Sequence, residues 1–290
     1  MIFAMKAMII TADDYGMCGI VDAAIDSCIE SGIVSSTNVI VNMQDLESVK
    51  SLRSRFPHIS IGMHWNITAG RPISPTVAIP SLVDENGDFY KLSVFLRRYK
   101  QGLVKKKDIK CELCAQYEVF RSLCGKADYW NTHQNSSLSI GTFGIFNRTA
   151  LELGIDRTRT FRRTYVKDKR LSAGQAIVEV FKRSFLDMWF GYVIPQTGTK
   201  LPDGRIFYFD DNQKTESIKN IGENIEWGNK QIVELVVHPA ISPSHPFFGT
   251  LTDMRVKEWK MFSSKDTLKY LNDNGIEVVT FEELNESKRF

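Results

Sequence analysis

Short apolar runs alternate with segments of helical period along most of the chain. A short apolar run bounded by turn residues is typical of a buried strand, whereas apolar residues three and four positions apart indicate an amphipathic helix. This pattern predicts strands at residues 6–12, 37–41, 59–64, 129–133, 160–166, 232–237 and 277–281. It predicts helices at residues 20–31, 46–56, 92–101, 107–124, 138–153, 173–190, 215–226 and 256–272.

The regular alternation of strands and helices predicts an α/β fold built on a parallel sheet. An open doubly wound sheet and a closed barrel both fit the pattern. Two stretches depart from it. Residues 66–88 are rich in Pro and Gly and indicate an ordered functional loop, and residues 195–212 look like an insertion. We expect residues 66–88 and part of 157–212 to cover the mouth of a functional site.

Polar residues follow several of the predicted strands, at the point where each strand ends. These residues are Asp13, Asp14, His64, His133 and His238. Functional groups gather at the carboxyl ends of the strands in both parallel folds. The five side chains can therefore converge, although they lie far apart in the sequence.

The chemistry of these five residues suggests a metal site with acid–base groups beside it. Two adjacent carboxylates, Asp13 and Asp14, repel each other, so the pair is favoured where one meets a cation and the other accepts a proton. One carboxylate and two imidazoles suit a metal with an open coordination position. His238, between an apolar strand and Pro239, could act as a general acid near neutral pH. The alternatives are a helix N-cap for the aspartates and a core position for His64.

Composition narrows the class of protein. The chain has 290 residues, of which 43% are hydrophobic and 24% charged, which is typical of a globular protein with a large core. The formal net charge is +3 and no long Lys/Arg run occurs, so nothing indicates nucleic-acid binding. No run of about 18 apolar residues exists, which argues against a membrane span. A cleaved signal peptide would remove the Asp13–Asp14 pair, so we expect a cytoplasmic protein.

The cysteines give little support for another kind of site. Five cysteines, an odd number, fit a reducing compartment. Cys111 and Cys114 form a CxxC motif within the predicted helix at 107–124, which could be a redox pair or half of a zinc site. No second pair at ligand spacing accompanies it, so the favoured interpretation is buried thiols on a helix.

Four segments together resemble the YdjC/ChbG family of carbohydrate deacetylases, which also includes the hopanoid-linked HpnK proteins. They read TADDYG at 11–16, GMHWNITAGRP at 62–72, NTHQ at 131–134 and ELVVHP at 234–239. The resemblance runs from about residue 6 to residue 284. The third segment departs from the usual Asp-Ser-His followed two residues later by His, because Asn131 and Asn135 occupy those positions. Ala240 replaces the usual Gly, and residues 157–212 match poorly.

The resemblance implies a distorted (β/α) barrel of the polysaccharide-deacetylase type, formed by residues 1–290 as a single domain. It implies a divalent metal, magnesium or zinc, held by Asp14, His64 and His133. It also implies Asp13 as general base and His238 as general acid. The expected reaction is metal-dependent removal of an N-acetyl group from a small N-acetylated saccharide or glycoconjugate.

Four residues are candidates for contacts with the substrate: Trp65, Asn66, Arg71 and Arg162. Trp65 could stack on a sugar face or pack in the core, and Arg71 could bind an acidic group or hold its loop. Arg162 belongs to a basic run at 157–163 that could bind an acidic sugar or form a solvated surface.

Alternative functions and the state of association stay open. One alternative is a metal-dependent phosphoesterase, although such enzymes often hold two metals through bridging carboxylates and more histidines. Another is a non-catalytic sugar-binding protein on an eroded deacetylase fold. A homodimer is compatible with the sequence.

Overall fold

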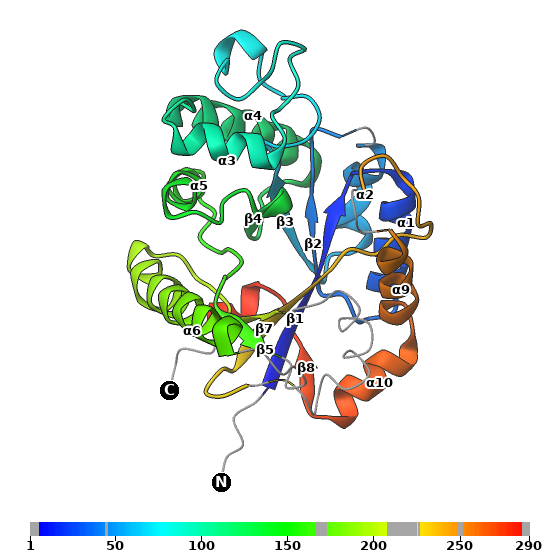
Figure 1. Cartoon of the computed structure of the whole chain (residues 1–290). Helices are drawn as coiled ribbons and strands as arrows, with labels where there is room; N and C mark the ends of the chain where they lie inside the picture. Colours follow the sequence, from blue (N-terminus) through cyan, green and yellow to red (C-terminus); the bar gives the residue numbers. More distant parts are fainter. Residues whose placement is uncertain are drawn as a thin grey trace.

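A computed structural model of the chain describes residues 6–43, 46–165, 173–207, 225, 227–248 and 252–285. Its centre is a sheet of parallel strands in the order β4-β3-β2-β1-β7-β6-β5, with β8 paired to β1 (Figure 1). The strands are β1 (Lys6–Tyr15), β2 (Ser36–Val39), β3 (Ser60–Trp65), β4 (Trp130–Thr132), β5 (Arg163–Tyr165), β6 (Gly204–Phe207), β7 (Ile232–Val237) and β8 (Ile276–Val278).

Strand β1 organises the sheet. It pairs with β7 on one side, while β8 pairs with its first residues and β2 with its last on the other side. The sheet curls, and single parallel bridges from Trp130 to Thr158 and from Arg157 to Lys200 continue the curl beyond β4. The result is a curled half-barrel, which confirms the predicted α/β fold of the distorted-barrel type.

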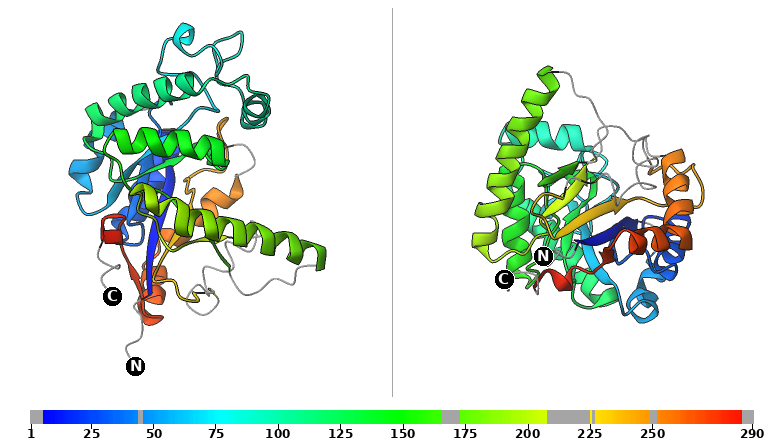
Figure 2. Two further views of the ribbon diagram at one scale, coloured as in Figure 1. Left: turned by 90° about the vertical axis from the view of Figure 1, so that its left-hand side faces the viewer. Right: turned by 90° about the horizontal axis from the view of Figure 1, so that it is seen from below.

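Helices surround the outside of the sheet in all the ribbon views (Figures 1 and 2). They are α1 (Gly19–Glu30), α2 (Glu47–Arg55), α3 (Leu92–Lys100), α4 (Lys106–Cys124), α5 (Ile140–Glu152), α6 (Ala173–Met188), α9 (Asp253–Phe262) and α10 (Lys265–Asp273). Helix α1 shows why they pack there. Val21, Ala24, Ile25, Cys28 and Ile29 are buried, and their helical spacing puts one apolar stripe against the sheet.

Three predicted elements differ from the structure. Residues 195–212, predicted to be an insertion, contain strand β6, which is short and carries an arginine in its middle. The predicted helix at 256–272 is two helices, because the chain breaks at Ser263 and the Ser264 side chain caps α10 by accepting from the Asp266 amide. The predicted helix at 215–226 lies outside the described residues, apart from Ile225.

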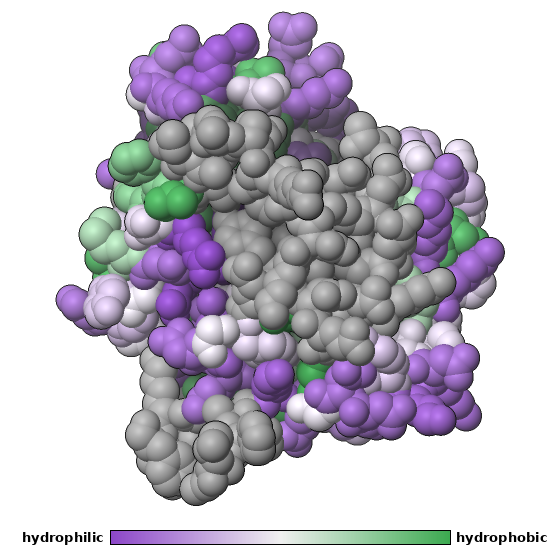
Figure 3. All heavy atoms as spheres, turned by 60° about the horizontal axis from the view of Figure 1, so that its bottom comes forward, coloured by the Kyte–Doolittle hydropathy of each residue, from purple (hydrophilic) through white to green (hydrophobic). Residues whose placement is uncertain are grey.

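The described surface shows neither a cysteine site nor a membrane-crossing element. All five cysteines are free thiols, and Cys111 is exposed, so the expectation that both CxxC thiols are buried was wrong. No described helix combines the length and apolar character that a bilayer crossing requires. Hydrophilic side chains prevail among the coloured residues on the face drawn in Figure 3.

A close contact in β3 leads to a first prediction. A Cβ atom on Gly62 would lie 2.4 Å from Cζ of Tyr129, whose ring is buried and stacks on Phe281 with ring centroids 3.8 Å apart. Gly62→Ala should therefore displace this stack and lower the free energy of unfolding by roughly 1–3 kcal/mol. Urea denaturation would measure the loss.

Gly144→Ala provides a matched control for this substitution. A Cβ atom on Gly144, in helix α5, would meet nothing within 4 Å. Because alanine favours helices over glycine, this variant should be up to about 1 kcal/mol more stable than the wild type. Equal denaturation midpoints for the two variants would contradict the packing argument at Gly62.

Candidate active site

Asp13 and Asp14 lie at the end of β1 and point into the same pocket. Neighbouring side chains on a regular strand point to opposite faces of the sheet. Here the pairing of β1 with β2 shifts between Ala12 and Tyr15, and Asp14 has a φ angle of 81°, which a residue other than glycine rarely adopts. This irregularity turns both carboxylates toward one cavity.

Two histidines approach the Asp14 carboxylate from strands β3 and β4, which lie beyond β2 in the sheet. His64 comes from β3, with its Nε2 atom 3.4 Å from Oδ1 of Asp14. His133 directly follows β4, with its Nδ1 atom 3.1 Å from the same oxygen. All three residues are buried, and their possible ligand atoms lie within 4.8 Å of one another. One oxygen and two imidazole nitrogens at this spacing fit a divalent cation.

Asn131, on β4, orients one of these histidines. Its side-chain oxygen contacts Nδ1 of His64, and because an amide oxygen only accepts, that nitrogen carries the proton. The other ring nitrogen of His64, Nε2, faces Asp14, where a metal ligand is needed. The Asn131 amide also lies 3.5 Å from Oδ1 of Asp13. Asn131, at a position where the resembling motif usually has Asp, therefore orients the His64 ring.

The Asp13 carboxylate forms a buried two-point ion pair with Arg159. Nη1 and Nη2 of Arg159 donate to its two oxygens at 2.8 and 2.7 Å, and Nε of Arg159 donates to Glu234 at 2.9 Å. Burial alone would raise the pKa of Asp13, but Arg159, with smaller contributions from His64 and His238, holds this pKa well below its usual range. Asp13 is therefore ionised and fixed in orientation.

Arg255, from helix α9, donates a hydrogen bond to the second carboxylate oxygen of Asp14, Oδ2. Its Nη2 atom donates to Oδ2 of Asp14 at 2.7 Å, while the two histidines face Oδ1. The guanidinium also lies over the Phe248 ring, 4.5 Å from the centroid. Burial raises the pKa of Asp14, but Arg255 and then the histidines outweigh it and hold the pKa well below its usual range. Asp14 thus presents a single charged oxygen to His64 and His133.

His238 also lies close to the Asp13 carboxylate. It directly follows β7, its Nε2 atom lies 3.8 Å from Oδ2 of Asp13, and its backbone amide donates to Glu258. About a quarter of its side chain is exposed, 23%, so the ring can meet a ligand entering from solvent.

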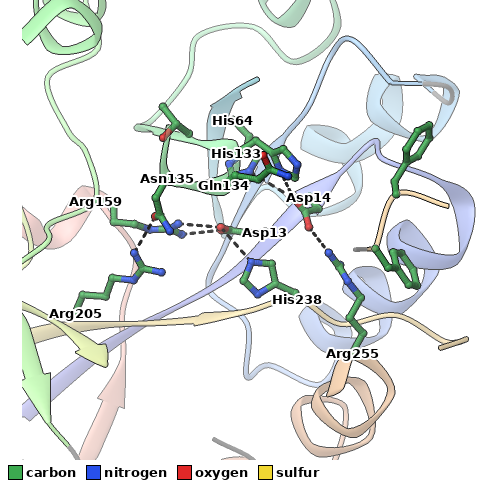
Figure 4. Close-up of a pocket in the computed structure, with 13 residues that line it drawn as sticks. Asp13, Asp14, His64, His133, Gln134, Asn135, Arg159, Arg205, His238 and Arg255 are labelled. Carbon is green, nitrogen blue, oxygen red and sulfur yellow. Dashed lines mark hydrogen bonds and ion pairs between the residues drawn. The ribbon is translucent and has the colours of Figure 1, made fainter. Parts of the chain in front are cut away.

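The pocket around these groups has a volume of about 460 Å³ (Figure 4). Its lining consists of Asp13, Asp14, His64, Thr132, His133, Gln134, Asn135, Arg159, Arg205, His238, Phe247, Phe248 and Arg255. The structure thus brings together the five residues at strand ends, with carboxylates, imidazoles and guanidinium groups facing one cavity.

The four expected substrate contacts lie outside this lining. Trp65 is fully buried and packs against Trp130 and Phe146, and its indole N–H donates to the Leu113 carbonyl. Because neither face of this ring is accessible, its position corrects the expectation that it stacks on a sugar. The reason is the strand period, since Trp65 follows His64 and points to the opposite face.

The side chains of Asn66, Arg71 and Arg162 likewise make contacts outside the pocket. Asn66 is buried, and its side-chain oxygen accepts from the amides of Thr68 and Ala69 at 3.1 Å each, so it holds its own loop. Arg71 pairs with an aspartate on the surface, with 76% of its side chain exposed. Arg162 pairs with Asp187 at 3.1 Å. The three residues lie outside the described pocket lining, and their contact with the substrate stays a prediction.

Of the two stretches expected at the mouth, only one contributes to the described lining. Residues 157–212 supply Arg159 and Arg205, whereas residues 66–88 supply none, although the Thr68 hydroxyl donates to Gln134 at 3.1 Å. Arg159 belongs to the basic run at 157–163, but no sequence pattern singles out Arg159, Arg205 or Arg255 as pocket residues. The composition of the run was the available signal for Arg159; nothing in the local sequence marks the other two.

The chain is similar to several known proteins. The model of the family described as YdjC-like protein matches residues 7–273. A carbohydrate deacetylase of Xenopus laevis is 25% identical and the alignment covers 96% of this chain and 97% of that protein. One of Geobacillus stearothermophilus is 26% identical over 95% of this chain and 96% of its own length. A chitooligosaccharide deacetylase of Yersinia pestis is 35% identical over 42% and 46% of the two chains.

The same fold occurs in a solved structure. The crystal structure of a protein from Enterococcus faecalis V583 superposes with a TM-score of 0.73 at 23% sequence identity, covering 97% of this chain and 99% of the other. At this identity the likeness establishes the fold alone.

Proposed function

The chain belongs to the YdjC-like family, and from this premise we propose that it is a carbohydrate deacetylase that uses a divalent cation. Its substrate would be a small N-acetylated saccharide or glycoconjugate, and its products acetate and a free amine. The observation that carries this proposal is the placement of Asp14, His64 and His133 in one pocket with Asp13 and His238. The named deacetylases among its relatives support it.

In this proposal Asp14, His64 and His133 hold the cation, which could be magnesium or zinc. When bound, such a cation polarises a carbonyl oxygen and makes a neighbouring water more acidic. The mixed oxygen and nitrogen ligands are those that zinc accepts readily, while magnesium prefers oxygen ligands. Elemental analysis of the purified protein would identify the metal.

Asp13 would act as the general base. Its carboxylate is ionised, and the two hydrogen bonds from Arg159 fix its oxygens beside the pocket. A water held there would lose a proton to Asp13 as its oxygen forms the new bond to the acetyl carbon.

His238 would act as the general acid. It reaches the pocket from β7, whereas the two expected histidine ligands come from the opposite side of β1, on β3 and after β4. When the bond between the acetyl carbon and the nitrogen breaks, the leaving amine takes up a proton. An imidazole carrying that proton can supply it near neutral pH.

The alternative functions find less support. A phosphoesterase with two metals needs a second group of carboxylate or histidine ligands. In the part of the chain that the structure describes, only Asp14, His64 and His133 form a group of three or more possible ligands. A non-catalytic sugar-binding protein has no need of an ionised Asp13 fixed by Arg159 next to that group.

Acetate release tests the proposal directly. The purified protein, with and without added divalent metal, would be incubated with a panel of N-acetylated monosaccharides, chitooligosaccharides and glycoconjugates. We expect metal-stimulated acetate release from at least one of them. Phosphate release from phosphate esters without acetate release would favour the phosphoesterase, and sugar binding without either product would favour the binding protein.

Two further expectations stay predictions. The homodimer is one, and helix α6 offers a candidate surface for it because Val180, Phe181, Phe185 and Met188 are exposed. Light scattering of the purified protein would measure its association state. The cytoplasmic location is the other, which the five free thiols fit.

A further inference from the structure

Positive charge is concentrated between the end of β3 and the first turns of helix α4. Residues 71–110 contain nine Lys and Arg residues against four Asp and Glu residues, a net charge of +5, whereas the whole chain has a net charge of +3. Seven of the nine lie within residues 97–110, namely Arg97, Arg98, Lys100, Lys105, Lys106, Lys107 and Lys110. In the part of the chain that the structure describes, only Lys110 among them forms an ion pair, with Glu152. The charge of the others is available to an acidic partner.

The three consecutive lysines, Lys105 to Lys107, work against the helix that they begin. Helix α4 has no side-chain cap at Lys105, and Asp108 is the only acidic residue in its first turn. The amino end of a helix is the positive end of its dipole, which favours acidic residues and disfavours basic ones. The stability of α4 therefore does not explain this run of lysines. Sequences depart from such local rules chiefly where function requires it.

The adjoining loop exposes aliphatic side chains. Val77, in a short 3-10 turn, is 87% exposed, and Leu103, between α3 and α4, is 49% exposed. Ser81 ties this loop to the lysines, because its hydroxyl donates to Oδ2 of Asp108 at 2.8 Å and accepts from the Lys105 amide at 2.9 Å. The chain between β3 and α3 projects from the molecule beside α3 and α4 (Figures 1 and 2). Exposed aliphatic side chains are thus held next to a basic cluster.

An anionic lipid bilayer fits both features. Ammonium groups close to its surface are attracted to acidic headgroups, and apolar side chains gain by entering the boundary between headgroups and acyl chains. A nucleic acid would use the positive charge but would leave Val77 and Leu103 in water. A rigid acidic protein would bury little area on a projecting turn, whereas a fluid bilayer can surround it. Binding of this kind needs no membrane-crossing helix.

We propose that this region docks the chain on an anionic lipid membrane. The docking surface consists of Val77, Leu103, Lys100, Lys105, Lys106 and Lys107, all of which are exposed. The two aliphatic side chains enter the headgroup region, and the lysines lie along the acidic surface. None of these residues lines the pocket, so docking is separate from the proposed deacetylase chemistry.

Vesicle co-sedimentation tests the docking surface. The full chain is mixed with vesicles of phosphatidylcholine alone, or of phosphatidylcholine with about 30% phosphatidylglycerol, at an ionic strength of about 0.1 M. We expect the partition coefficient to be on the order of 10- to 100-fold higher for the acidic vesicles, since each lysine near the surface adds to the attraction. Raising the ionic strength to about 0.5 M should remove most of this difference, because salt screens the attraction.

A charge-reversing variant assigns the binding to the lysines. Lys105→Glu, Lys106→Glu and Lys107→Glu, combined in one chain, should lower the partition coefficient on acidic vesicles by about tenfold or more. Because acidic residues suit the amino end of a helix, the Tm of this variant should equal or exceed that of the wild type, which separates lost binding from lost folding.

A matched control carries the same change in net charge elsewhere. It combines three substitutions of exposed lysines on α9 and α10, Lys260→Glu, Lys265→Glu and Lys269→Glu. Because the attraction of a lysine falls off within about 10 Å of the surface, this control should bind acidic vesicles within about threefold of the wild type.

A second variant separates a membrane from other acidic partners. Val77→Ser with Leu103→Ser keeps every charge and should lower the partition coefficient about 3- to 10-fold, because no aliphatic side chain enters the bilayer. Since soluble saccharides reach the pocket directly, acetate release should be the same in all these variants as in the wild type.

Three results would overturn the docking surface. They are equal partition of the wild type into neutral and acidic vesicles, wild-type binding by the lysine variant, and wild-type binding by the Val77→Ser, Leu103→Ser variant. Binding to a duplex RNA without binding to acidic vesicles would also overturn it, and would assign the basic cluster to a nucleic acid.

Discussion

Asp13→Asn should lower kcat on the order of 10²- to 10⁴-fold while leaving the metal content unchanged. The substitution keeps the shape of the side chain but removes the negative charge that accepts a proton. The three expected metal ligands are untouched. Steady-state acetate release and elemental analysis on the same preparation would measure both quantities.

We expect Asp13→Asn to have a smaller relative effect on the free energy of unfolding than on kcat. Removing one partner of an isolated buried ion pair costs roughly 3–5 kcal/mol, because the other charge stays buried and unpaired. Arg159 keeps its contact with Glu234 at 2.9 Å, so the loss in Asp13→Asn should be smaller. Any stability that the ionised Asp13 contributes is present above its unfolded pKa of about 3.9 and is lost as the pH falls.

Glu234→Gln is the matched control for the charge of Arg159. Glu234 contacts the same guanidinium from β7, is fully buried and does not line the pocket. If Asp13 acts chemically, Glu234→Gln should lose less than about tenfold in kcat, well short of the loss expected for a missing general base. Comparable losses in the two variants, or near-normal turnover in Asp13→Asn, would show that Asp13 only balances the charge of Arg159.

The fold and the strand-end residues could be predicted because both depend on local patterns. Apolar runs predicted most strands of the curled sheet, and parallel strands carry their carboxyl ends to one edge. Asp13, His64 and His238 therefore had to lie near one another once the strand order was known. Strand β6 escaped prediction because it has four residues, Gly204–Phe207, of which two are glycine and arginine.

The arginines of the pocket could not be predicted in the same way. Arg255 comes from helix α9, 241 positions after Asp14, and its partner depends on how that helix packs against α1. A long side chain can reach a partner far away in the sequence, so the residues next to it do not indicate which partner it contacts. Conversely, Trp65 was predictable as a core residue, because a strand residue next to His64 must face the other way.

Removing any of Asp14, His64 and His133 should abolish both metal binding and turnover. Each contributes one of three ligand atoms that lie within 4.8 Å of one another, and two ligands alone hold a divalent cation weakly. In the Ala variants we expect metal content below a tenth of the wild-type value after dialysis, with kcat reduced on the order of 10³-fold or more. Elemental analysis and acetate release would measure the two effects.

Two controls separate ligation from general damage to the fold. His58→Ala removes an exposed histidine and should keep full metal content. Asn131→Ala removes the amide oxygen that contacts Nδ1 of His64 and should weaken metal affinity about 10- to 100-fold, because the ring is no longer fixed.

Thermal denaturation provides a readout that does not depend on activity. A cation that binds only the folded chain raises its stability by mass action, so adding metal to the metal-free wild type should raise Tm. The same addition should leave the Tm of His64→Ala unchanged. If all three Ala variants keep the wild-type metal content and the wild-type Tm increase, the cation binds elsewhere. The role of Asp14 would then be to balance the charge of Arg255, which donates to it at 2.7 Å.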